Sequence, residues 1–136
     1  MKYQHYLIPF VLAVALVACR SSGAPGSHAA SLGQEVLLAP GERAVFDPHG
    51  LIVEFVRVLE DSRCPADVTC VWAGEVKLQL STRIRAAEAV RHEITMGQDA
   101  TLGEFRLAVV RVQPERLSTR EISPEEYRVA LSVESN

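Results

Sequence analysis

The chain reads Tyr127-Arg128-Val129-Ala130-Leu131-Ser132-Val133-Glu134 close to its C-terminal end. Large apolar residues occupy every second position, and the residues between them are polar or small. Successive side chains of a strand point to opposite faces, so this period of two predicts a strand with one face on a core and the other in water. Residues 76–81 and 90–96 alternate in the same way. The sequence therefore predicts a domain built mainly of strands.

Two longer apolar runs change phase along their length. In residues 51–58 the apolar positions switch from odd to even numbers, and residues 105–112 do the same. A change of phase indicates either a β-bulge or a strand that is buried on both faces. Both alternatives keep these two runs as strands.

Turn-forming residues separate the runs, at Pro40-Gly41 and in the segments 47–50 and 96–99. The stretch Ser123-Pro124-Glu125-Glu126 predicts one helical turn, with a serine N-cap, a proline in the first helical position and a glutamate for a capping box. About seven short strands with little helix predict an all-β fold. We expect a single small antiparallel β-sandwich or partly open barrel, with one short helical turn near the C-terminus.

The N-terminal part of the chain has a different composition. Residues Leu7–Ala18 are apolar and uncharged, follow the basic residue Lys2 and precede Cys19. As a helix this segment would span only about 18 Å, whereas the hydrocarbon core of a membrane is about 30 Å thick. The segment therefore predicts a signal peptide rather than a membrane span.

The last residues of that segment, Leu16-Val17-Ala18-Cys19, resemble the lipobox of bacterial lipoproteins. The resemblance implies that a lipoprotein signal peptide, residues 1–18, is removed and that Cys19 carries acyl chains. Several acyl chains anchor a protein durably in a membrane, whereas a single chain does not. Arg20, in place of an aspartate after the cysteine, implies sorting to the periplasmic face of the outer membrane. The alternative is an ordinary secretory signal followed by a chance cysteine.

The mature chain is predicted to have two parts. Residues 20–33 are rich in Ser, Gly, Ala and Pro and lack apolar periodicity, so residues 19–33 are interpreted as the lipidated cysteine and a flexible tether. His28 is expected to be a solvated residue of that tether. Residues 34–136 are long enough for a core of their own and form the predicted β domain.

The chain has three cysteines, and an odd number in an exported protein needs an explanation. Acylation of Cys19 accounts for one of them. Cys64 and Cys70 lie six positions apart in a compartment that permits disulfides, so we expect them to be bonded to each other.

These two cysteines belong to a loop, residues 61–74, that also holds the only tryptophan. A disulfide around so short a ring would stabilise the fold by about 2 kcal/mol. Asp61 and Arg63 are expected to form a turn-stabilising pair. Trp72 is in phase with Val76, so we expect it to point inward and fill the core with its indole N–H paired.

The loop has the pattern D-S-R-C-P-x4-C-x-W-A-G, which resembles that of an uncharacterised family of small exported bacterial β-proteins and lipoproteins. The resemblance implies a β-rich domain with this loop near its middle. It implies no activity.

Several catalytic and metal-binding interpretations find little support. A cysteine nucleophile with His92 or His49 as its base needs a thiolate, which a disulfide removes. Two thiolates without further ligands nearby do not make a zinc site, and Glu60, Asp61 and Asp67 lack the spacing of a calcium loop. Neither G-x-S-x-G nor S-x-x-K occurs. We expect no cofactor, no metal and no catalytic residue; a small metal-dependent or hydrolytic envelope enzyme is the alternative.

The remaining interpretation is a non-catalytic, lipid-anchored cell-envelope protein that serves as a protein-binding or structural module. The net charge is −3 and the arginines are spread singly, so we expect no nucleic acid among its partners. The expected partners are the membrane, through the lipid anchor, and an envelope protein, and the sequence identifies no small-molecule substrate. A constrained loop loses little entropy on binding. The candidate contact residues are therefore those between the cysteines: Pro65, Ala66, Asp67, Val68 and Thr69. The alternative is that the loop only stabilises the fold.

Overall fold

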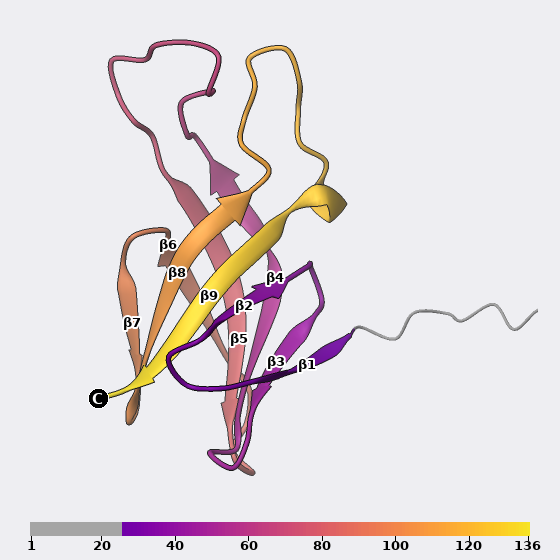
Figure 1. Cartoon of the computed structure of the whole chain (residues 1–136), viewed down its shortest axis with the longest axis vertical. Helices are drawn as coiled ribbons and strands as arrows, with labels where there is room; N and C mark the ends of the chain where they lie inside the picture. The colour runs from indigo at the N-terminus through magenta and orange to yellow at the C-terminus, as the bar shows by residue number, and fades with distance from the viewer. Residues whose placement is uncertain (1–25) are drawn as a thin grey trace, which may run out of the picture.

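A computed structural model describes residues 26–136 of the chain. The expected signal peptide, Cys19 and the first part of the expected tether therefore lie outside the described residues. Within them, no helix is long and apolar enough to cross a membrane. The described chain forms nine strands and one short 3₁₀ turn (Figure 1). The elements are β1 (Ser27–Ala30), β2 (Glu35–Leu38), β3 (Arg43–Phe46), β4 (Leu51–Asp61), β5 (Val76–Ile84), β6 (Val90–Thr95), β7 (Asp99–Leu102), β8 (Phe105–Gln113), η1 (Pro124–Glu126) and β9 (Arg128–Ser135).

The strands form two sheets that pack face to face (Figure 1). The first sheet has the order β1-β3-β4-β5-β6, and the second has the order β2-β9-β8-β7. All neighbours are antiparallel except β1 and β3, which are parallel. The sheets do not close into a barrel. The predicted all-β fold is confirmed, in its sandwich form.

The core lies between the sheets and follows the predicted alternation. On β5, Val76, Leu78 and Leu80 are fully buried, while Lys77 and Gln79 between them are partly exposed. Apolar side chains of this kind drive the packing of one sheet on the other. The largest fully buried side chains come from both sheets: Phe46, Leu51 and Phe55 from the first, and Phe105, Leu107 and Leu131 from the second.

Both predicted changes of phase are β-bulges. The pairing of β4 with β5 shifts register between Phe55 and Arg57 and again between Val58 and Glu60. The pairing of β8 with β9 shifts between Val109 and Arg111. An extra residue at each shift turns the following side chains to the other face, so a long strand keeps one face on the core.

The predicted turns are also present. Pro40-Gly41 precedes β3, residues 47–50 join β3 to β4, and the segment after β6 turns into β7. In η1, the backbone N–H of Ser123 donates a hydrogen bond of 2.9 Å to Oε2 of Glu126, which is one half of the predicted capping box.

The end of the expected tether is structured, which corrects the boundary at residue 34. Residues Ser27–Ala30 form β1 alongside β3, and Nε2 of His28 lies 3.2 Å from Oε2 of Glu42, so His28 is not simply a solvated linker residue. The residues of β1 are small or polar, so they show no apolar alternation. The strand forms nevertheless, because an edge strand is held by its ladder of hydrogen bonds rather than by burial. Short strands of this kind also explain why nine strands are present instead of about seven.

Candidate functional site

Two loops lie side by side at one end of the sandwich (Figure 1). The first, residues 62–75, connects β4 to β5 and is called the cysteine loop. The second, residues 114–123, connects β8 to η1 and is called the return loop. The backbone N–H of Ala66 in the cysteine loop donates a hydrogen bond of 2.8 Å to the carbonyl oxygen of Arg116 in the return loop. The two loops therefore support each other.

The cysteine loop is closed at its base and across its middle. The N–H of Ser62 donates to the carbonyl oxygen of Glu75 at 2.8 Å, and the N–H of Cys64 donates to that of Ala73 at 2.9 Å. The predicted disulfide joins Cys64 to Cys70, with 5.9 Å between their Cα atoms. These bonds fix the backbone of the loop on both sides of the ring.

Asp61 and Arg63 form the predicted ion pair at the foot of the cysteine loop. Nη2 of Arg63 lies 2.6 Å from Oδ2 of Asp61, and Nε lies 2.8 Å from Oδ1, so the pair is bidentate. The side chains are only 6% and 14% exposed, for Asp61 and Arg63 respectively. A charged pair with so little water needs further partners to remain stable there.

Those partners tie the loop to the second sheet. Nη1 of Arg63 donates to the carbonyl oxygen of Val112 at 2.8 Å, and Nη2 donates to that of Pro114 at 3.1 Å. The hydroxyl of Tyr127 donates to Oδ2 of Asp61 at 3.1 Å. The guanidinium of Arg63 thus joins the end of β4 to the end of β8. The carboxylate of Asp61 joins the end of β4 to Tyr127, directly before β9.

The titration of these groups follows from their contacts. Burial raises the pKa of Asp61, but the hydrogen bonds and charge of Arg63 lower it more, so the pKa lies below its ordinary value. The hydrogen bond to Asp61 raises the pKa of Arg63. Burial, followed by the charge of Asp61, raises the pKa of Tyr127. At neutral pH the network therefore consists of an ionised carboxylate, a charged guanidinium and a neutral phenol.

Asp67, one of the predicted contact residues, is used within the molecule. Its Oδ1 accepts a hydrogen bond of 2.8 Å from the backbone N–H of Ser118, and its Oδ2 accepts one of 2.6 Å from the Ser118 hydroxyl. These hydrogen bonds lower the pKa of Asp67. Its carboxylate therefore holds the return loop in place.

The prediction that Trp72 fills the core is wrong. Trp72 is 82% exposed and its neighbour Val71 is 91% exposed. β5 begins only at Val76, and Gly74 has a φ of +69° that turns the backbone just before it. The alternation counted back from Val76 therefore does not extend to Trp72, because the residues between them are not extended strand.

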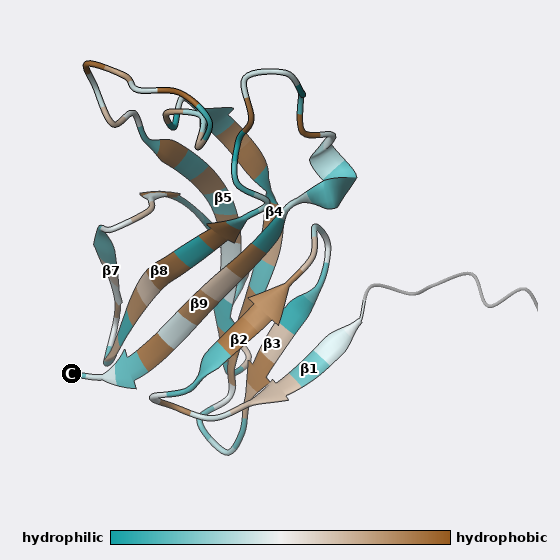
Figure 2. Cartoon of the chain, turned by 45° about the horizontal axis from the view of Figure 1, so that its top comes forward, coloured by the Kyte–Doolittle hydropathy of each residue, from teal (hydrophilic) through white to brown (hydrophobic). Residues whose placement is uncertain are grey.

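The two loops together expose a set of large apolar side chains, which we call the apolar tip. Hydrophobic residues colour parts of this end of the molecule brown in Figure 2. Of the other residues between the cysteines, Pro65 is half-buried, and Ala66 and Thr69 are exposed. The apolar tip consists of Val68, Val71, Trp72 and Leu117.

The residues considered for catalysis are not brought together. Cys64 and Cys70 are both in the disulfide and offer no thiolate. His92 on β6 makes a hydrogen bond of 2.8 Å to Thr82, and His49 lies in the β3–β4 turn with its ring edge-on to Phe105. These groups belong to separate parts of the fold.

The carboxylates considered for calcium have other partners. Asp61 is paired with Arg63, Asp67 with Ser118, and Oε2 of Glu60 lies 3.6 Å from Nζ of Lys77. Between residues 26 and 136, His, Cys, Asp and Glu side chains form no group of three or more with the geometry to hold a metal ion.

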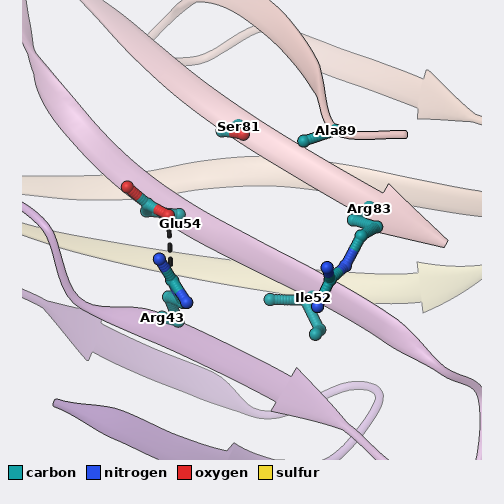
Figure 3. A pocket seen from close by; sticks show the side chains of 6 residues that line it. All are labelled: Arg43, Ile52, Glu54, Ser81, Arg83 and Ala89. Carbon is teal, nitrogen blue, oxygen red and sulfur yellow. Dashed lines mark hydrogen bonds and ion pairs between the residues drawn. The ribbon is translucent and has the colours of Figure 1, made fainter. Parts of the chain in front are cut away.

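The cavities in the surface are of moderate size. One of about 370 Å³ lies between the cysteine loop, Met96 and the end of β8. Another, of about 120 Å³, lies on the outer face of the first sheet (Figure 3). In the second, Nε of Arg43 donates to Oε2 of Glu54 at 2.9 Å, with Ser81 and Arg83 on the neighbouring strand. The smaller cavity thus surrounds an ion pair that is already satisfied within the chain.

No protein-family model, no curated protein and no solved structure matches this chain.

Proposed function

We propose that this chain is a non-catalytic, lipid-anchored protein of the cell envelope that binds another protein through its apolar tip. One observation carries the binding proposal: Trp72 and Val71 stand almost fully exposed on a loop whose backbone is held by a disulfide and by a second loop. The lipid anchor is argued from the lipobox-like residues Leu16–Cys19.

An exposed tryptophan on a rigid loop has the properties of a binding anchor. Trp is enriched among the residues that contribute most to protein interfaces, because a single ring buries a large area in a pocket of the partner. Bracing of the loop lowers the entropy that is lost on binding. The hydrogen bonds of Asp67 to Ser118 and of Ala66 to Arg116 therefore serve binding indirectly, by fixing where the apolar tip lies.

The fold itself suits an exported protein. A disulfide between Cys64 and Cys70 persists in an oxidising compartment and is rare in the cytosol. If Cys19 carries the lipid, eight positions separate it from the first residue of β1, which limits the reach of the linking segment to about 28 Å. The domain then works close to the membrane surface.

The test uses a photo-crosslinking amino acid in place of Val68, in the membrane-anchored chain within its own envelope. We expect one crosslinked protein product. We expect Trp72→Ala to reduce its yield at least tenfold, since truncating an interface anchor costs about 2 kcal/mol or more of binding free energy. Leu37→Ala is the matched control, because Leu37 is another exposed large apolar residue but lies on β2, outside both loops.

The yield with Leu37→Ala should equal that of the parent chain. A product that consists only of lipid would contradict protein binding. A protein product whose yield Trp72→Ala leaves unchanged would remove the apolar tip from the proposal.

A further inference from the structure

The first sheet ends in a strand with an open edge. β6 pairs with β5 on one side, and in the described part of the chain no other strand pairs with it. It is six residues long, whereas the other three edge strands, β1, β2 and β7, have four residues each. Edge strands are commonly protected by short length, a proline, a bulge or charged side chains, and of these β6 has only the charges of Arg91 and Glu93. The sequence of β6, Val-Arg-His-Glu-Ile-Thr, has no proline, and its pairing with β5 has no shift of register.

The inner face of this edge is incompletely covered. Val90 stands opposite Thr82 in the pairing of β6 with β5, and Thr82 is buried on the core side, so Val90 also faces the space between the sheets. Val90 is nevertheless 54% exposed. A cavity of about 250 Å³ separates this part of β5 and β6 from β7, with Val90, His92 and Leu102 among its walls. Apolar surface on the core side of β6 thus remains in contact with water.

The outer face of β6 carries two opposite charges. Arg91 and Glu93 are both exposed, lie two positions apart and so point to the same side of the sheet. Neither forms an ion pair with any other residue between 26 and 136. The kinds of residue are therefore arranged symmetrically about His92, with a charged residue and then a β-branched residue on each side, and the two charges have opposite signs.

We propose that the open edge of β6 pairs with β6 of a second copy of this chain, antiparallel and centred on His92. In that register Arg91 of each copy stands opposite Glu93 of the other, and Val90 stands opposite Ile94. In this register an odd-numbered residue always stands opposite an odd-numbered one, and an even-numbered residue opposite an even-numbered one. Since successive side chains point to opposite faces, charged residues meet on the outer face and apolar residues meet on the core face. Opposite charges placed across from each other stabilise an antiparallel pair.

The neighbouring symmetric registers are disfavoured by the same side chains. A pairing centred on Arg91 places the two copies of Arg91 directly opposite each other, and a pairing centred on Glu93 does the same with Glu93. Like charges in directly opposite positions are destabilising. The register centred on His92 is thus selected by charge, and it joins the two first sheets into one continuous sheet.

The strength of this contact follows from its size. A two-fold contact through single strands is small compared with a standard protein interface, so we expect a dissociation constant on the order of 0.1 mM in solution. Two chains confined to one membrane would have a higher effective concentration and would associate more completely. The β6 edge shares no residue with the apolar tip, so its pairing does not depend on what that tip binds.

The experiment measures self-association of the full chain in detergent by sedimentation equilibrium. Arg91→Glu alone and Glu93→Arg alone each place like charges opposite each other twice, and we expect each to weaken the dimer by about tenfold or more. The double variant Arg91→Glu with Glu93→Arg exchanges the two charges and restores opposite pairs. We expect it to dimerise within about threefold of the parent chain.

Thermal unfolding of each variant serves as the folding control, since both side chains are exposed on the sheet surface. A parent chain that stays monomeric up to about 1 mM would overturn the proposal. A double variant that dimerises as weakly as the single variants would also overturn it, because the pairing would then not depend on Arg91 facing Glu93.

Discussion

The contacts of Arg63 account for much of the order at the loop end of the molecule. One guanidinium binds both oxygens of Asp61 and two backbone carbonyls, those of Val112 and Pro114. The planar fork of an arginine suits this role, whereas the ammonium of a lysine would not reach four acceptors with the same geometry. Arg116 donates in turn to the carbonyl oxygen of Arg63 at 2.7 Å, so the residue is fixed from both sides.

The lowered pKa of Asp61 predicts a pH-dependent contribution to stability. Because the carboxyl binds its proton less readily in the folded chain than in the unfolded chain, its contribution is complete above the ordinary Asp pKa of about 3.9 and is lost as the pH falls through the folded value. At pH 7 we expect Asp61→Asn to lower the free energy of unfolding by about 3 kcal/mol, since Arg63 is then buried without its partner. Urea unfolding at a series of pH values measures this difference.

The difference between parent chain and Asp61→Asn should shrink as the pH falls from about 5 through the ordinary Asp pKa of about 3.9 and then through the lower pKa of the folded chain. The matched control is Asp99→Asn, because Asp99 is half-exposed and lies 3.9 Å from its Arg106 partner. We expect a change of less than about 1 kcal/mol for the control. A constant difference for Asp61→Asn across this pH range would show that its ionisation is not coupled to folding.

At the scale of the elements, the base of the cysteine loop extends the hydrogen-bonded pairing of β4 with β5, and the rest of the loop has no such pairing. The bonds of Ser62 to Glu75 and of Cys64 to Ala73 extend the ladder, and Gly74 makes the close approach possible. A Cβ atom built on Gly74 would collide with the carbonyl oxygen of Ser62. Glycine at this position thus allows the loop to close at its base.

We predict that Gly74→Ala destabilises the domain by about 2 kcal/mol more than Gly97→Ala does. Both glycines have positive φ values, +69° and +86°, so both substitutions carry backbone strain of about 1 kcal/mol. Only the substitution at Gly74 adds a clash with the backbone, since nothing lies within 4 Å of a Cβ at Gly97. Equal shifts of the urea midpoint for the two variants would contradict this account of the loop.

At the scale of the whole molecule, the edges of the two sheets decide where the domain begins and what it can pair with. β1 covers the free edge of β3, and the carbonyl oxygen of Gly26 accepts a hydrogen bond of 3.0 Å from the N–H of Arg43. β6 leaves the opposite edge of the same sheet open. Since uncovered edges favour pairing with other chains, the two ends of this sheet have different roles.

We therefore predict that a chain beginning at Ser31 is less stable than one beginning at Gly26. It lacks β1 and the contact of His28 with Glu42, and we expect a loss of about 2 kcal/mol in the free energy of unfolding. Urea unfolding of the two chains measures this loss. Equal stability would mean that β1 contributes nothing and that the domain begins only at residue 34, as its apolar pattern indicates.

Much of the fold could be predicted because the relevant signals are local. Alternation on β5 and β9, the two changes of phase on β4 and β8, the turn at residues 47–50 and the helical turn after Ser123 each depend on a few neighbouring residues. The disulfide was predictable from the number and spacing of the cysteines. The strand β1 was missed because hydrogen bonds to β3, rather than apolar side chains, hold it in place.

The sequence by itself determined the all-β class, the positions of the long strands and the Cys64–Cys70 bond, because side-chain period, turn residues and cysteine spacing act over short distances along the chain. Only the tertiary structure decided that Trp72 is exposed, that Asp67 holds Ser118 and that Arg63 reaches the end of β8. These contacts join residues up to 51 positions apart. Their geometry depends on how two sheets place their loops at the same end, which no local pattern of residues encodes.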